Sequence, residues 1–373
     1  MQNKLVQIIP IILIITFIAF PVKADTIELS PTDKAIMYLD EFVPGENDGL
    51  RILAYRMAGK LEPLDEMATD YLLKLDDALA SGRDIYAPYA VLGVTAAGMN
   101  VNNMQDGILL DRIAQLCNES YNPEILAECL FALSSNKYTL PNGSVSIETI
   151  IIKILGQQNP DGSFGAEGTE QMYITAKVVQ ALAYHRNVAG VQGAIDNAGG
   201  YMVNNQAQNA SYPSKQGDVV SATTNSIIAL ELNGHDTTRL NGRNAINFLY
   251  QAQNSNGGFG SYVGAASDDL NTTYSIIALQ THQIRNTSAF NFTENLSKEL
   301  PKPIEKPEST PEPSSETETS SEVTSTESLA TSENTKEKDF LSTRTVLNSL
   351  IACAVIGILI PIMIILIIKK IRK

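Results

Sequence analysis

Tryptophan is absent from this chain of 373 residues, and aromatic residues as a whole make up only 6% of it. Basic residues are also few, because 27 lysines and arginines face 41 aspartates and glutamates, a net charge of −14. Proteins that bind nucleic acids need a concentrated basic surface. We therefore do not expect a nucleic acid partner.

The three cysteines and three histidines are too few and too scattered to predict a disulfide framework or a metal site. Cys117 and Cys129 could pair in an oxidising compartment, but free buried thiols fit the sequence equally well. Cys353 lies in an apolar run near the C-terminus. No three zinc ligands can be named, so we predict no metal.

Both ends of the chain have the character of membrane-targeting segments. Residues 1–24 predict a signal peptide, with Lys4 before an apolar run and Ala24 at a plausible cleavage point. Residues 345–368 carry no charge and are long enough to span a bilayer as a helix. The basic residues 369–373 favour a cytoplasmic tail. We predict a single-pass type I protein of the cell membrane with an extracellular domain; an uncleaved N-terminal anchor is the alternative.

A stalk is predicted to join that domain to the membrane span. Residues 301–344 are rich in Pro, Ser, Thr and Glu and have few large apolar side chains. Such a composition cannot bury enough apolar surface to fold. We predict a disordered spacer there, with a binding motif as the alternative.

Residues 25–300 predict one all-α domain. We find no stretch with the alternating pattern of a β-strand, and expect about eleven or twelve helices in five or six hairpins. The clearest helical patterns cover residues 48–59, 63–81, 86–98, 107–118, 123–134, 146–155, 173–185, 221–232 and 270–282.

A sequence motif is repeated in this domain. IIKILGQQNPDGSFG at residues 151–165 returns as INFLYQAQNSNGGFG at residues 246–260, and YMVNNQAQNASYP at residues 201–213 is a degenerate copy between them. Each copy precedes a helix with an Ala-Leu pair, and aligning these pairs places Thr175, Thr223 and Thr272 at one position. A period of this size predicts helical hairpins that bury their apolar faces only against neighbouring repeats.

We predict a structural role for the motif itself. Its Asn-Pro-Asp-Gly and Asn-Ser-Asn-Gly segments form turns, its phenylalanines pack beneath the next helix, and its glutamines bond to backbone groups at helix ends. The residues concerned are Gln157, Asp161, Gly162, Phe164, Gly165, Gln251, Gly257, Gly258, Phe259 and Gly260.

The repeat resembles that of the terpenoid cyclase and protein prenyltransferase superfamily, which includes the squalene cyclases, over about residues 35–285. The resemblance implies an α/α toroid, in which paired helices close into an inner and an outer ring. It is also similar to the repeat of cobalamin carriers, so a corrinoid ligand is possible. Those carriers close over the ligand with a second domain that does not follow residue 300 here, so a partner chain would be needed.

The catalytic signatures that the resemblance implies are missing. Lys74 and Ala266 stand where the Asp-x-Asp-Asp acid of the cyclases would begin, and neither Cys117 nor Cys129 has the Asp two residues earlier that a prenyltransferase zinc site needs. The Cys-Gly-Glu-Gln thioester motif is absent too. A Ser-His-Asp triad stays open, but we expect a protein without catalytic activity and identify no cofactor.

Polar residues at the starts of the inner helices are our candidates for ligand binding at the mouth of the cup. They are Glu170, Gln171, Tyr173, Ser221, Thr224, Asn225, Asp269, Asn271 and Tyr274. Helix capping is the alternative role for such residues. We therefore predict a membrane-anchored extracellular protein that binds an unknown ligand or partner chain in its cup. The alternative is a lipid-handling enzyme of the cyclase or prenyltransferase type with a divergent active site.

Overall fold

The computed structural model describes residues 29–167, 170–292, 296 and 298–302. Over these residues the chain forms twelve α-helices and four short 3₁₀-helices, with isolated β-bridges but no β-strand. The all-α prediction is therefore confirmed for this part of the chain. The predicted signal peptide, all but the first two residues of the stalk, the membrane span and the basic tail lie outside the described residues.

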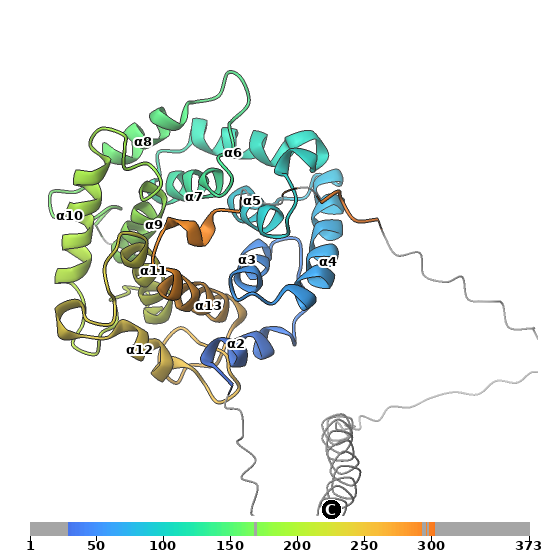
Figure 1. The fold of residues 1–373 in the computed structure, drawn as a ribbon. Coiled ribbons are helices and arrows are strands. Elements are labelled where there is room, and N and C mark those ends of the chain that lie inside the picture. The colour runs from blue at the N-terminus through green and yellow to red at the C-terminus, as the bar shows by residue number, and fades with distance from the viewer. Residues whose placement is uncertain (1–28, 168–169, 293–295, 297, 303–373) are drawn as a thin grey trace, which may run out of the picture. The chain divides into compact units, whose positions relative to one another are not determined.

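Six helices form an inner ring. Each inner helix packs against the inner helix that follows it in the sequence. The last one, α13, packs against the first, α3, so that the ring closes (Figure 1). These helices are α3 (Gly49–Met57), α5 (Ala87–Ala96), α7 (Pro123–Ser134), α9 (Gln171–Leu182), α11 (Val219–Leu232) and α13 (Asp269–Ile284).

The other six helices lie around this ring; α6 packs against two inner helices, and each of the others packs against one (Figure 1). They are α2 (Pro31–Leu39), α4 (Leu61–Ala80), α6 (Ile108–Glu119), α8 (Ile147–Leu155), α10 (Val191–Asn204) and α12 (Ala245–Ala252). The 3₁₀-helices η1 (Val101–Asn103), η2 (Gln105–Gly107), η3 (Leu240–Gly242) and η4 (Thr287–Phe290) complete the described elements.

The two sets of helices differ in how they bury their side chains, and the sequence explains the difference. On α8 the buried residues Ile150, Ile151 and Ile154 form one face, while Ile152 is exposed. On α11 nearly every residue from Val220 onward is buried, the polar ones included. A helix that is apolar on one face belongs at a surface, and one that is buried all round belongs in the interior.

The repeated motif builds three similar loops, each leading from an outer helix to an inner one. In all three, a glutamine side chain donates its amide to the carbonyl oxygen four residues later. These glutamines are Gln158, Gln206 and Gln253, so the equivalent positions lie one or two residues after the Gln157 and Gln251 of the sequence motif. Gln157 bonds to the Lys153 carbonyl oxygen instead, and Gln251 is exposed.

Glycine is required in two of these turns. Gly162 has a φ of 88° and Gly257 a φ of 89°. A Cβ atom would lie 2.4 Å from the Asn197 carbonyl oxygen in the first turn and 2.2 Å from the Lys34 carbonyl oxygen in the second. Both positions combine a left-handed backbone with contact against another backbone, which only glycine accommodates. Ala210 holds the same place in the middle copy with a φ of 71°.

An aromatic ring and a threonine connect each loop to the inner helix that follows. Phe164, Tyr212 and Phe259 are fully buried. Their backbone N–H groups donate to the hydroxyl oxygens of the three threonines at one repeat position, Thr175, Thr223 and Thr272, each over 2.9 Å. These threonines therefore hold the loop against the helix and are not available to a ligand.

Candidate functional site

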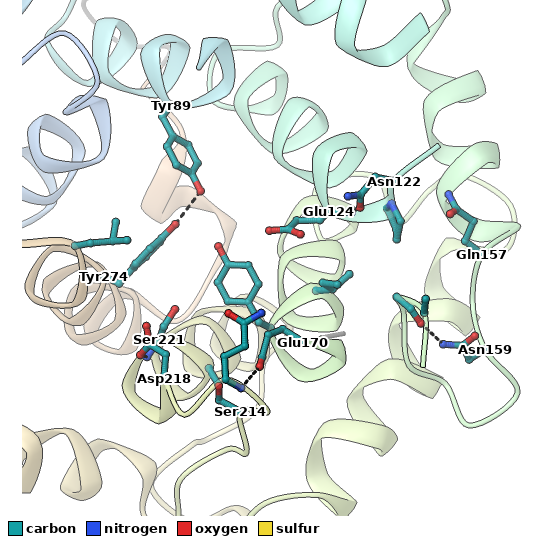
Figure 2. Close-up of a pocket in the computed structure, with 18 residues that line it drawn as sticks. Tyr89, Asn122, Glu124, Gln157, Asn159, Glu170, Ser214, Asp218, Ser221 and Tyr274 are labelled. Carbon is teal, nitrogen blue, oxygen red and sulfur yellow. Dashed lines mark hydrogen bonds between the residues drawn. The ribbon is translucent and has the colours of Figure 1, made fainter. Parts of the chain in front are cut away.

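A cavity of about 880 Å³ opens at the end of the ring where the inner helices begin. We call it the central cavity. It is lined by the first turns of α5, α7, α9, α11 and α13, by the loop of the first motif copy, and by the segment before α11 (Figure 2). This volume lies in the range of small-molecule sites in proteins.

Three carboxylates from successive inner helices line the central cavity: Glu124 near the start of α7, Glu170 before α9, and Asp218 before α11. The remaining lining residues are polar or aromatic with a few apolar ones, and no Lys, Arg or His is among them: Tyr89, Asn122, Pro123, Gln157, Asn159, Gly165, Ala166, Tyr173, Ile174, Ser214, Gln216, Ser221, Ala222, Leu270 and Tyr274.

Two of the three carboxylates accept hydrogen bonds from neutral groups. Glu170 accepts from the backbone N–H of Gln216 over 2.5 Å. Asp218 caps α11 by accepting from the N–H of Ser221 over 3.0 Å, and its other oxygen accepts from Asn271 over 3.4 Å. Burial raises the pKa of Asp218, and the like charges of Asp268 and Glu170 add to the rise.

Glu124 differs from the other two because its carboxylate has neither a hydrogen bond nor an ion pair with any described residue. It points into the central cavity (Figure 2). Burial raises the pKa of Glu124, the Glu128 carboxylate one turn later raises it further, and Lys177 offsets part of the effect. An acceptor with its full capacity unused therefore faces the open space.

Beneath the central cavity, four tyrosines surround a buried ion pair. The ammonium of Lys177 lies 3.4 Å from the Glu128 carboxylate, and both side chains are only 7% exposed. Tyr89 donates to the same Glu128 oxygen over 2.6 Å, and Tyr86 donates to the other oxygen. We call Tyr86, Tyr89, Tyr173, Tyr274, Glu128 and Lys177 the tyrosine cluster.

The ammonium of Lys177 is held by aromatic groups as well as by its counter-ion. Its nitrogen lies 3.0 Å from the Tyr274 hydroxyl, and 4.7, 5.3 and 5.5 Å from the ring centres of Tyr274, Tyr173 and Tyr89. Burial lowers the pKa of Lys177, but the tyrosine hydroxyls and the Glu128 carboxylate outweigh it and raise the pKa well above its ordinary value. The lysine is therefore charged at neutral pH.

The hydroxyls of Tyr89 and Tyr173 stay protonated because burial disfavours the charged form of a tyrosine, an effect on the pKa that Lys177 offsets only in part at Tyr173. Burial raises the pKa of Tyr89 and of Tyr173 well above the ordinary value, and the negative charge of Glu128 acts in the same direction. The Tyr89 and Tyr274 hydroxyls lie 2.9 Å apart (Figure 2). The Glu128 carboxylate, the Lys177 ammonium and the hydroxyls of Tyr86, Tyr89 and Tyr274 are therefore linked in one hydrogen-bonded network.

Four of the nine residues predicted at the mouth line the central cavity: Glu170, Tyr173, Ser221 and Tyr274. The other five support the structure around it. Gln171 lies 3.4 Å from the Gly165 carbonyl oxygen of the motif loop. Asp269 forms an ion pair with Arg51 over 3.4 Å.

The remaining three predicted residues are buried between helices. Thr224 donates to the Ser221 carbonyl oxygen over 3.0 Å, and Asn225 accepts from Gln180 of α9 over 3.2 Å. Asn271 donates to the capping residue Asp268 over 3.0 Å. For these positions the capping and packing alternative describes the structure better than a place at the mouth.

Glu128 and Lys177 are not among the residues predicted from the sequence, although the repeat contains a signal for them. Each lies four residues before the alanine of its helix's Ala-Leu pair, and Asn225 and Tyr274 hold the same position in the next two repeats. One register position of the inner helices α7, α9, α11 and α13 therefore carries Glu, Lys, Asn and Tyr in turn. In the structure the residues at this position in α7, α9 and α13 meet in the tyrosine cluster.

Two histidines lie at the other end of the ring, where the inner helices end: His185 follows α9, and His282 is in the last turn of α13. The His185 ring lies 3.0 Å from the Ser134 hydroxyl, which donates its own proton to the Leu130 carbonyl oxygen. His282 lies 2.7 Å from the buried carboxylate of Glu231. These contacts join neighbouring inner helices.

No known family model matches this chain. A search of curated proteins likewise found no relative.

Within the residues that the structure describes, no cluster of three or more His, Cys, Asp and Glu side chains could hold a metal ion. None of the described helices combines the length and apolar character needed to cross a membrane. Cys117 and Cys129 are both free and buried.

Proposed function

We propose that this chain is a cell-surface binding protein whose ring of helices is an α/α toroid of the terpenoid cyclase and prenyltransferase type, and that a ligand or partner occupies its central cavity. The closed succession of inner helices supports the toroid. The observation that carries the binding function is the open cavity of about 880 Å³, with three carboxylates and three tyrosines in its lining. The signal peptide and the membrane span stay sequence predictions. Together they predict that the domain with the central cavity lies outside the cell.

The best alternative is a lipid-handling enzyme, and one observation favours it. Glu128 is a buried acid among tyrosines, which is the setting that a cyclase-type proton donor needs. However, its two oxygens already accept from Tyr86 and Tyr89, and Lys177 balances its charge. Both oxygens of Glu128 are therefore engaged within the tyrosine cluster, and neither is free to contact a substrate.

The space beside Glu128 also favours binding over catalysis. The apolar chamber next to it, lined by residues such as Leu92, Phe131 and Ile277, has a volume of about 20 Å³. A cavity must have a volume of about 10–15 Å³ to hold a single water molecule. No hydrocarbon substrate fits there without a rearrangement of the inner helices.

Mass spectrometry of small molecules released from the purified full-length protein tests the binding function. A variant that narrows the cavity provides the comparison: Ser221 lines it, and no described contact involves its hydroxyl, so Ser221→Phe adds bulk without removing a hydrogen bond. We expect a released compound from the natural protein that is absent from Ser221→Phe. Equal recovery from both proteins would place the ligand elsewhere and contradict the proposal.

The same preparation tests the enzyme alternative. Incubation with a linear polyprenyl substrate should leave that substrate unchanged. Formation of a cyclic or transferred product by the natural protein, and its loss in Glu128→Gln, would favour the enzyme.

A further inference from the structure

The charges around the central cavity point to the chemical class of its ligand. Its lining residues include three acids and no base. The nearest buried cation, Lys177, already has Glu128 as its counter-ion, so this pair contributes no net charge. Asp269, which begins α13, lies 3.4 Å from Arg51 and shares this cation with Asp48. Glu124, Glu170 and Asp218 are thus left without a cationic partner among the described residues.

Helix N-termini offset part of this negative charge. Each is equivalent to roughly half a positive charge, carried by its free N–H groups. Some of these groups are already engaged, since Asn122 caps α7, Asp218 caps α11 and Asp268 caps α13. Glu124 lies one residue beyond the Asn122–Pro123 start of α7 and accepts from no N–H group, so its charge faces the cavity.

The hydrogen-bonding capacity of the lining agrees with the charges. A carboxylate offers about four lone-pair positions. In the described structure Glu124 uses none of these, Glu170 uses one, and Asp218 uses two. A ligand rich in donors is needed to satisfy them, and an ammonium group supplies three donors together with the missing positive charge.

Resting on the proposed function, we propose that the central cavity binds an organic polyamine, whose ammonium groups pair with Glu124, Glu170 and Asp218. These carboxylates come from three successive helices of the inner ring, so a flexible chain with two or three ammonium groups can reach more than one of them. The hydroxyls of Tyr89, Tyr173 and Tyr274 provide further acceptors on the side of the tyrosine cluster.

Isothermal titration calorimetry of the full-length protein with spermidine tests this assignment. We expect saturable binding that weakens as sodium chloride is added, because salt screens charge pairs. Glu124→Gln should weaken the affinity about tenfold or more, the loss expected for one hydrogen bond to a charged group. Glu170→Gln should act similarly, since its amide oxygen can still accept from the Gln216 N–H. Ser221→Phe should abolish binding.

The matched control is Glu62→Gln. It removes one negative charge from an exposed residue on the first turn of α4, away from the cavity, so it should leave the affinity unchanged. Circular dichroism checks that each variant is folded. If Glu124→Gln does not fold, Glu170→Gln provides the test in its place.

Two results would overturn the assignment: no binding of spermidine, or binding that Glu124→Gln and Glu62→Gln affect equally. The proposed function can fail or stand separately. A neutral compound released from the natural protein but not from Ser221→Phe would keep the cavity as a binding site while excluding the polyamine. Equal release from both proteins would remove the binding site itself.

Discussion

The buried ion pair of the tyrosine cluster should be essential to the stability of the ring. Lys177→Met keeps much of the side-chain volume but removes the ammonium, leaving a Glu128 carboxylate that is 7% exposed with only two tyrosine donors. Loss of one partner from a buried pair costs about 3–5 kcal/mol because the other charge stays buried. At about 2–4 °C per kcal/mol for a large domain, the melting temperature should fall by roughly 6–20 °C.

An exposed ion pair of nearly the same length provides the control. Lys74 and Asp70 lie 3.3 Å apart but are 41% and 54% exposed, so Lys74→Met, which also removes a hydrogen bond to the Pro44 carbonyl oxygen, should cost about 1 kcal/mol. Adding Glu128→Gln to Lys177→Met should recover part of the lost stability, since it removes the unpaired charge. Thermal and urea unfolding followed by far-ultraviolet circular dichroism measure all four proteins. If Lys177→Met cost no more than Lys74→Met, the cluster would not carry the burial that we assign to it.

Four further predictions follow from the motif, the cavity and the ends of the chain. Phe164→Ala should cost about 3–5 kcal/mol in unfolding free energy, because the ring is fully buried; a loss below 1 kcal/mol would contradict its packing role. Thr175→Val should cost about 1–3 kcal/mol by leaving the Phe164 N–H unpaired, whereas Thr175→Ser should be milder. Calorimetry across pH should show that spermidine binding weakens as pH falls. Because the pKa values of Glu124 and Asp218 are raised, this weakening should begin above the pH range in which ordinary carboxyl groups titrate. The stability of the unbound domain should change in the opposite direction: these two groups add stability as pH falls, and that contribution is lost as pH rises through their folded-state pKa values. Protease added to intact cells should remove the helical domain and leave residues 345–368 protected; protection of the domain would refute the predicted topology.

The fold was largely predictable from the sequence, because local signals repeat. Apolar periodicity and the motif copies at residues 151–165 and 246–260 predict helices that the structure contains. The middle copy was recognisable although alanine replaces its turn glycine, since Asn209, Ser211 and Tyr212 keep the chemistry of the turn. Apolar periodicity and turn motifs depend on residues that are close together in the sequence, so they can be recognised without knowledge of the tertiary structure.

The site was harder to predict because it depends on which way each side chain faces. Ser221 and Asn225 are one turn apart on α11, yet Ser221 lines the cavity while Asn225 bonds to α9. Glu124 precedes the clear motif copies, so the motif alignment did not single it out. Glu128 on α7 and Lys177 on α9 come together only when neighbouring repeats pack, because their positions are 49 residues apart, a full repeat.

A crystal structure of the protein grown with spermidine would test the central claim most directly. We expect electron density for the polyamine in the central cavity, with ammonium groups within hydrogen-bond distance of Glu124 and at least one of Glu170 and Asp218. The Lys177–Glu128 pair should be unchanged beneath it. An empty cavity at saturating spermidine, or density only at other acidic surfaces, would show that the central cavity is not a polyamine site.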